Sequence, residues 1–105
     1  MTRILITGSG GFLGKEFIKY FSKEHTVISM NREELDVSIE EQVIDFFKHN
    51  EVDSILHTAF VGGKNPQEDD FLGLCQNLLA YKNLILHKKK SQILVCFGSG
   101  AAYDR

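Results

Sequence analysis

The chain of 105 residues has little of what several classes of protein need. Its two cysteines, Cys75 and Cys96, lie far apart among apolar residues, so we expect buried, reduced thiols rather than a disulfide or a metal site. Its four histidines do not have the spacing of zinc ligands. No apolar run approaches the roughly 20 residues that span a bilayer, and no signal peptide opens the chain. We therefore expect a cytoplasmic protein with no membrane segment and no bound metal.

An excess of charge of one sign is also missing. Twelve basic and 14 acidic residues give a formal net charge of −2, which argues against nucleic acid or an anionic membrane as the main partner. The like-charge run HKKK, residues 87–90, is typical of a solvated helix end, where cations offset the helix dipole. Proline occurs once, at Pro66, and no repeat or low-complexity tract is present. A hydrophobic content of 43% then indicates one ordinary globular domain.

The chain instead alternates short apolar runs with stretches of helical periodicity. The expected strands are residues 3–7, 25–30, 53–59 and 92–98. Helices are expected from the glycines to about residue 23, after residue 38, and over residues 68–87. Ser38 and Glu41 fit a capping box for the second helix. The expected buried face of the third helix consists of Phe71, Leu74, Cys75, Leu78, Leu79 and Ile85.

This series predicts an α/β, Rossmann-like fold. A parallel sheet with right-handed crossovers should carry helices on both faces. The expected strand order is 3-2-1-4, which would place a crevice at the carboxyl ends of the first and fourth strands.

Four glycines lie within seven positions between the first strand and the first helix: Gly8, Gly10, Gly11 and Gly14. A P-loop fails twice, since its first glycine falls on Ser9 and its hydroxyl residue on Glu16. The G-x-G-x-x-G fingerprint fails once, at Leu13. The spacing G-x-x-G-x-x-G fits fully, through Gly8, Gly11 and Gly14.

In such a loop each glycine has a physical role. The first permits backbone torsions closed to other residues, and the second lets the chain approach a pyrophosphate. The last lets the helix pack closely, while the helix N-terminus offers N–H groups to the anion. The sequence therefore predicts a dinucleotide site, with a purely structural glycine turn as the alternative.

Residues 7–14, TGSGGFLG, resemble the TGxxGFxG signature of extended short-chain dehydrogenases/reductases, the nucleotide-sugar epimerase, dehydratase and reductase group. Four later blocks resemble GDP-fucose synthase-type members of this family: NREELDV, HTAFVGG, CQNLL and FGSGAAYD. The resemblance implies cofactor contacts at the glycine loop, after the second strand and at the end of the third strand. The residues so implied are Thr7, Gly8, Ser9, Gly10, Gly11, Phe12, Leu13, Gly14, Asp36, Val37, Thr58, Ala59 and Phe60.

The resemblance also implies individual roles. Asp36 and Val37 would contact the adenine, although the Asp36 carboxylate could instead cap backbone groups. Ser99 would carry the catalytic hydroxyl. Asn77 would be a structural or water-binding asparagine, with simple exposure as the alternative. His57 receives no role.

The end of the second strand bears on the choice of cofactor. An acid there suits the ribose diol of NAD, whereas an arginine suits the 2′-phosphate of NADP. The chain has Asn31 and Arg32 at this point, with acids only afterwards. We therefore expect NADP, with Arg32 as the phosphate partner, and keep NAD as the alternative.

Hydride chemistry in this family needs a tyrosine with a lysine four residues later. Four positions beyond Tyr20 and Tyr81 stand Glu24 and Ile85, and Tyr103 has no such position. We therefore expect residues 1–105 to be the amino-terminal, NAD(P)-binding part of a larger nucleotide-sugar enzyme, without its substrate domain and inactive alone. Strand four would then be an unpaired apolar edge, which predicts self-association. A non-catalytic dinucleotide-sensing module and a UDP-sugar epimerase are the other hypotheses.

Overall fold

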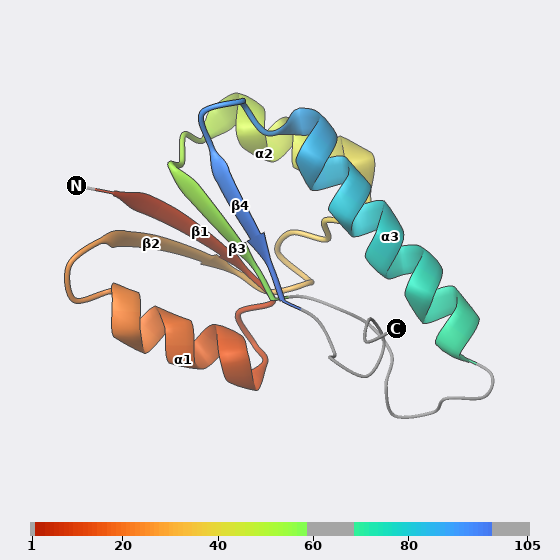
Figure 1. The fold of residues 1–105 in the computed structure, drawn as a ribbon, viewed down its shortest axis with the longest axis horizontal. Helices are drawn as coiled ribbons and strands as arrows, with labels where there is room; N and C mark the ends of the chain where they lie inside the picture. Colours follow the sequence, from red (N-terminus) through yellow and green to blue (C-terminus); the bar gives the residue numbers. More distant parts are fainter. Residues whose placement is uncertain (1, 59–68, 98–105) are drawn as a thin grey trace.

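The carboxyl ends of four parallel strands meet at one edge of a single sheet (Figure 1). The computed structural model describes residues 2–58 and 69–97. Its strands are β1 (Arg3–Thr7), β2 (Thr26–Met30), β3 (Ser54–His57) and β4 (Ile93–Cys96). Its helices are α1 (Phe12–Phe21), α2 (Glu40–His49) and α3 (Asp69–His87). The predicted alternation of strands and helices is thus confirmed, with ends shifted by a few residues.

The strand order is β2-β1-β3-β4, so the predicted order 3-2-1-4 is wrong. After β2 the chain does not add the next strand on the far side of β2 from β1. The segment that follows carries Leu35 and Val37 into the cluster around Leu5 and Ile55, which takes the chain back across β1. β3 therefore pairs with the other side of β1, and the order reverses between β1 and β3 rather than between the first and fourth strands.

The helices cover both faces of the sheet, as predicted (Figure 1). Because right-handed crossovers that run in opposite directions place their helices on opposite faces, α1 lies on one face and α2 and α3 share the other. β1 alternates accordingly: Leu5 packs toward α2 and α3, whereas Ile4 and Ile6 pack toward α1. A sheet covered on both sides holds the carboxyl edge of β1 and β3 in a fixed position.

Three local predictions are corrected by the structure. α2 begins after Ile39 without a side-chain cap, since the Ser38 hydroxyl bonds the Asp36 carboxylate instead of forming a capping box. Cys96 is exposed and Cys75 half-buried, so the predicted burial of these two free thiols is wrong.

The third correction concerns the buried face of α3. Leu78, Leu79 and Ile85 point outward, with 55%, 45% and 43% of their surface exposed. The buried side is instead formed by Gly73, Ala80, Asn83 and Leu84. The side chains of Phe71 and Leu74 lie outside the described residues.

Candidate functional site

The glycine loop joins the buried end of β1 to the start of α1. Gly8 has φ 70°, a conformation that L side chains rarely adopt, and its carbonyl accepts a hydrogen bond from the Gly11 amide at 3.1 Å. A Cβ on Gly14 would lie 2.5 Å from the Gly8 oxygen and 2.9 Å from the Ser9 Cα. The loop therefore folds back tightly on the first turn of α1, and glycine is required at both ends of it.

Glycines 10 and 11 have space around them. A Cβ on Gly10 would come no closer than 4.0 Å to Asn31, and one on Gly11 would lie 3.6 Å from the Gly8 oxygen. Gly11 is the N-cap of α1 and provides no side-chain cap, so the helix presents uncapped N–H groups at this end. This part of the loop is shaped to receive an anion against its backbone.

Two threonines and a histidine at the carboxyl ends of β1 and β3 hold the start of the loop in place. Thr58 Oγ1 donates to the carbonyl oxygens of Thr7 at 2.6 Å and of Gly8 at 3.3 Å. Thr7 Oγ1 and His57 Nδ1 form a buried hydrogen bond of 2.7 Å. Burial lowers the pKa of His57 to about 4, so the imidazole is neutral near pH 7. The carboxyl ends of β1 and β3 are thereby locked together under the loop.

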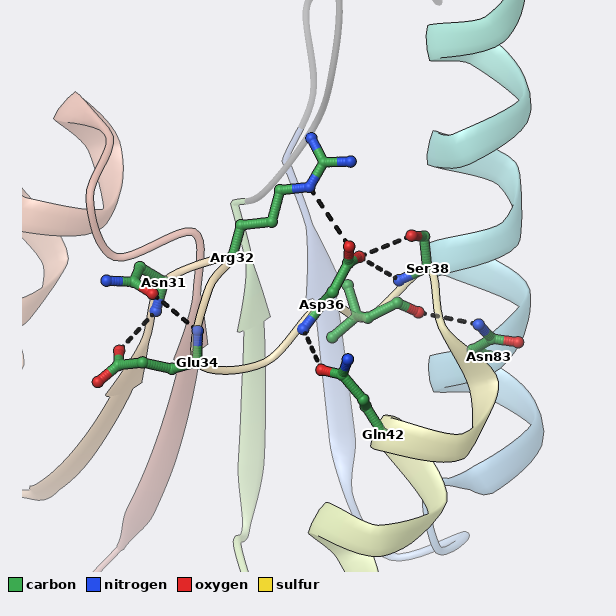
Figure 2. Close-up of polar contacts among 8 residues, drawn as sticks. Asn31, Arg32, Glu34, Asp36, Ser38, Gln42 and Asn83 are labelled. Atoms are coloured by element: carbon green, nitrogen blue, oxygen red, sulfur yellow. Dashed lines mark hydrogen bonds and ion pairs between the residues drawn. The ribbon is translucent and has the colours of Figure 1, made fainter.

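Residues 31–38, between β2 and α2, form one wall of a cavity that the glycine loop also lines. Figure 2 shows the polar contacts of this segment. It has no regular secondary structure over residues 31–38, and side chains satisfy much of its backbone. Asn31 and Glu34 exchange hydrogen bonds, each side chain accepting at 2.9 Å from the backbone amide of the other. Arg32 Nε lies 3.4 Å from the Asp36 carboxylate. The wall thus carries a cation–anion pair on its open side.

Asp36 organises the later half of this wall. Burial raises the pKa of its carboxyl, but hydrogen bonds from the hydroxyl and amide of Ser38, with the charge on Arg32, outweigh burial and hold that pKa below its ordinary value. Its own amide donates to Gln42 Oε1 at 2.8 Å. The carboxylate therefore caps backbone groups, as one of the two interpretations of Asp36 expected, while still lining the cavity.

A cavity of about 710 Å³ lies between the two walls, within the range of roughly 300–1,000 Å³ typical of ligand pockets. α3 contributes a third side. The residues that line the cavity are Gly8, Gly10, Gly11, Phe12, Leu13, Gly14, Asn31, Arg32, Glu33, Leu35, Asp36, Val37, Ser38, Thr58, Gln76, Asn77 and Ala80. The structure thus gathers three separated sequence blocks around one space at the carboxyl edge of the sheet.

Most of the predicted cofactor residues lie in this cavity. Thr7 and Ser9 instead support the loop: Thr7 is fully buried, and the Ser9 amide donates to the Met30 carbonyl at 3.2 Å. Ala59, Phe60 and Ser99 lie outside the described residues.

Sequence interpretation missed Gln76 and Ala80 as lining residues, and it missed Asn83 entirely. The available signal for Asn83 was a polar residue among the apolar ones of a helix. Within the described part of the chain, no group of three or more histidine, cysteine or acidic residues could hold a metal ion. None of the helices described there is long and apolar enough to cross a membrane.

The fold and the glycine loop define a Rossmann-like α/β protein. Residues 1–70 match the family described as the RmlD substrate binding domain, a match that includes β1 to β3 and the glycine loop. The chain belongs to this family.

Individual relatives agree with the family match. GDP-L-colitose synthase from Yersinia pseudotuberculosis is 30% identical over 108 residues, which cover 98% of this chain and 35% of that protein. A GDP-mannoheptose C4 reductase from Campylobacter jejuni with NADP bound is 29% identical, with a TM-score of 0.79 over 97% of this chain and 32% of that one. A GDP-D-glycero-L-gluco-heptose synthase from the same organism, in the presence of NADPH, is 28% identical, with a TM-score of 0.76 over the same shares. The resemblance to nucleotide-sugar enzymes is confirmed, and the chain spans about a third of the length of these relatives.

Proposed function

We propose that the chain is the amino-terminal, NADP-binding part of a nucleotide-sugar reductase or epimerase/dehydratase that acts by hydride transfer. The observation that carries this proposal is the cavity of about 710 Å³ that the glycine loop shares with residues 31–38 and α3. The relatives with NADP or NADPH in their crystals support the same cofactor.

The residues present fit a dinucleotide. The backbone at Gly10 and Gly11, with the uncapped start of α1, would hold the pyrophosphate, because nothing in the protein fills the space that side chains there would take. Asp36 and Val37 would face the adenine, and Thr58 would keep the loop in place. When bound, the nicotinamide would supply a hydride to the sugar in a reductase, or take one up and return it in an epimerase or dehydratase.

Arg32 would select NADP over NAD. Its side chain is 52% exposed at the cavity, and its ion pair with Asp36, at 3.4 Å, is long enough to be rearranged. A guanidinium suits a 2′-phosphate because its N–H donors match the phosphate oxygens. NAD remains the alternative cofactor.

Competitive titration of NADP and NAD tests this proposal. Arg32→Ala should weaken NADP binding by about 10- to 100-fold, the worth of a charge-assisted hydrogen bond, and NAD binding far less. Arg3→Ala is the matched control, since Arg3 lies at the opposite end of β1 and bonds the Glu51 carbonyl. Equal loss for both cofactors would refute the role of Arg32, and no binding of either dinucleotide by the unsubstituted chain would refute the function.

A non-catalytic dinucleotide-sensing module is the second candidate. The cavity at the glycine loop accounts for dinucleotide binding alone, which a sensor shares with an enzyme. Turnover separates the two. A reductase should oxidise NADPH in the presence of a GDP-4-keto sugar, whereas an epimerase or dehydratase should convert a nucleotide sugar with no net change in the dinucleotide. Dinucleotide binding without turnover of any nucleotide sugar would support the sensor.

A second copy of the chain is the proposed partner besides the nucleotide sugar. The outward side of α3 exposes Leu78, Leu79, Ile85 and Leu86, and exposed apolar residues that lie together typically mark an interaction surface. β4 ends the described sheet, with Ile93 62% exposed. An apolar face beside an open strand edge favours association between copies.

A cytoplasmic location is proposed as well, because both cysteines are free.

A further inference from the structure

The most deeply buried polar side chain of α3 is that of Asn83, which is 2% exposed. Its neighbours on the buried side of the helix are Ala80 and Leu84. Burying an amide in apolar surroundings is costly unless it is hydrogen-bonded. The bond that Asn83 makes runs from Nδ2 to the Val37 carbonyl oxygen at 2.9 Å, across 46 positions of sequence (Figure 2). A long-range contact of this kind fixes where the backbone of Val37 lies.

Val37 is the middle of three consecutive residues whose backbone groups are hydrogen-bonded by side chains. The Asp36 amide donates to Gln42, and the Ser38 amide donates to the Asp36 carboxylate at 3.0 Å. All three residues line the cavity. Because this stretch has no strand or helix partner, its position depends on these side-chain bonds together with the burial of Val37 in the core. The bond from Asn83 ties the stretch directly to α3, whereas the Gln42 bond ties it to α2.

α3 also forms the third side of the cavity. Ala80, one turn before Asn83, lines the cavity together with Gln76. One helix therefore contributes lining residues and also holds the wall opposite the glycine loop. A change in the Asn83 bond would alter the separation of these surfaces without removing any side chain that lines the cavity.

We propose that Asn83 is a positioning residue that holds the Asp36–Val37 wall at the distance from the glycine loop that the adenosine half of the dinucleotide requires. This inference rests on the proposed dinucleotide function. Asn83 acts through the Val37 carbonyl and does not itself line the cavity.

Two variants and a matched control test the proposal. Asn83→Leu removes the donor and suits the apolar surroundings, while Asn83→Asp keeps the shape and replaces the donor by an acceptor. Gln92→Leu is the control: Gln92 is 6% exposed, and its Nε2 donates to the Val52 carbonyl at 2.8 Å. It precedes β4, at the opposite edge of the sheet from the cavity. Both sites thus lose a buried amide-to-valine-carbonyl bond.

Binding of adenosine 2′,5′-bisphosphate, measured by calorimetry below the unfolding temperature of every variant, is the first readout. We expect about fivefold weaker binding for both Asn83 variants and less than a twofold change for Gln92→Leu. Hydrogen exchange without ligand is the second readout. The Asp36 and Ser38 amides should exchange faster in the Asn83 variants than in Gln92→Leu. The control should lose at least as much global stability, because Gln92 Oε1 also accepts from the Lys89 amide at 2.7 Å.

The outcomes are distinguishable. If the unsubstituted chain binds the bisphosphate and the Asn83 variants bind it as well as Gln92→Leu does, the positioning role is overturned and the proposed function stands. If the unsubstituted chain binds neither the bisphosphate nor a dinucleotide, both are overturned. Should one Asn83 variant fail to fold, the other, with the exchange rates of the Asp36 and Ser38 amides, decides the question.

Discussion

Replacement of Gly14 by alanine tests the tight packing between the glycine loop and α1. The new Cβ would lie 2.5 Å from the Gly8 oxygen, 2.9 Å from the Ser9 Cα and 3.1 Å from the Gly8 carbonyl carbon. All three atoms belong to the backbone, so no side-chain rotation can relieve the contacts. Either the loop or the first turn of α1 must shift.

Two effects of opposite sign determine how much Gly14→Ala changes the free energy of unfolding. Alanine is favoured over glycine inside a helix by about 1 kcal/mol, which would stabilise the variant if space allowed. Forcing a methyl group into a filled space costs about 1–3 kcal/mol. Because the obstacles at Gly14 are backbone atoms well inside contact distance, we expect the upper part of that range. The net loss should be about 1–2 kcal/mol, or about 4–8 °C in Tm for each kcal/mol.

Urea denaturation followed by circular dichroism measures this change. Gly10→Ala is the control, because its Cβ would lie 4.0 Å from the nearest atom, and its stability should stay within about 0.5 kcal/mol of the unsubstituted chain. A Gly14→Ala variant as stable as the unsubstituted chain, or more stable, would refute the reasoning. The helix preference would then outweigh a contact that the structure makes prohibitive.

Two further predictions concern acid stability and assembly. Since the pKa of His57 falls to about 4 on burial, the unfolded state binds its proton first as the pH drops, and the free energy of unfolding should fall between about pH 6.5 and 4 by up to about 1.4 kcal/mol per pH unit. This slope should flatten in His57→Asn, and an unchanged slope in denaturation at several pH values would contradict it. Light scattering at tens of micromolar should show association that Ile85→Lys on α3 or Ile93→Lys on β4 weakens; a monomeric unsubstituted chain would refute the proposed self-association.

Periodicity predicted the elements of this fold but not the order of its strands. β1 and β3 carry the buried aliphatic residues, whereas β2 has no fully buried residue and lies at an edge. Strand composition alone does not say on which side of β1 a later strand pairs. The information lay in Leu35 and Val37, two apolar residues in a segment without regular structure, whose burial turns the chain back across the sheet.

The same limit explains the error on α3. Apolar residues occur on every side of this helix, so their spacing does not select a buried face. The buried side carries small or amide residues, Gly73, Ala80 and Asn83, since it must approach the sheet and hold the residue 31–38 wall. The larger Leu78 and Leu79 point outward, on the side of the helix that was predicted to be buried.

The glycine loop was predicted best. For the three glycines of its G-x-x-G-x-x-G spacing, the structure gives different reasons why glycine is present. Gly8 is required by its φ of 70°, and Gly14 by backbone atoms within 3.1 Å of the missing Cβ. Gly11 satisfies neither condition, because its backbone has φ −85° and its Cβ would lie at an ordinary 3.6 Å. The folded protein favours glycine at position 11 only because this residue is the N-cap of α1, where glycine is preferred over alanine. A ligand that approaches the backbone there would be a second reason, so we expect Gly11→Ala to lose dinucleotide binding in addition to the roughly 0.5–1 kcal/mol of stability that the cap accounts for. A variant that loses this stability but still binds the dinucleotide would indicate a purely structural turn.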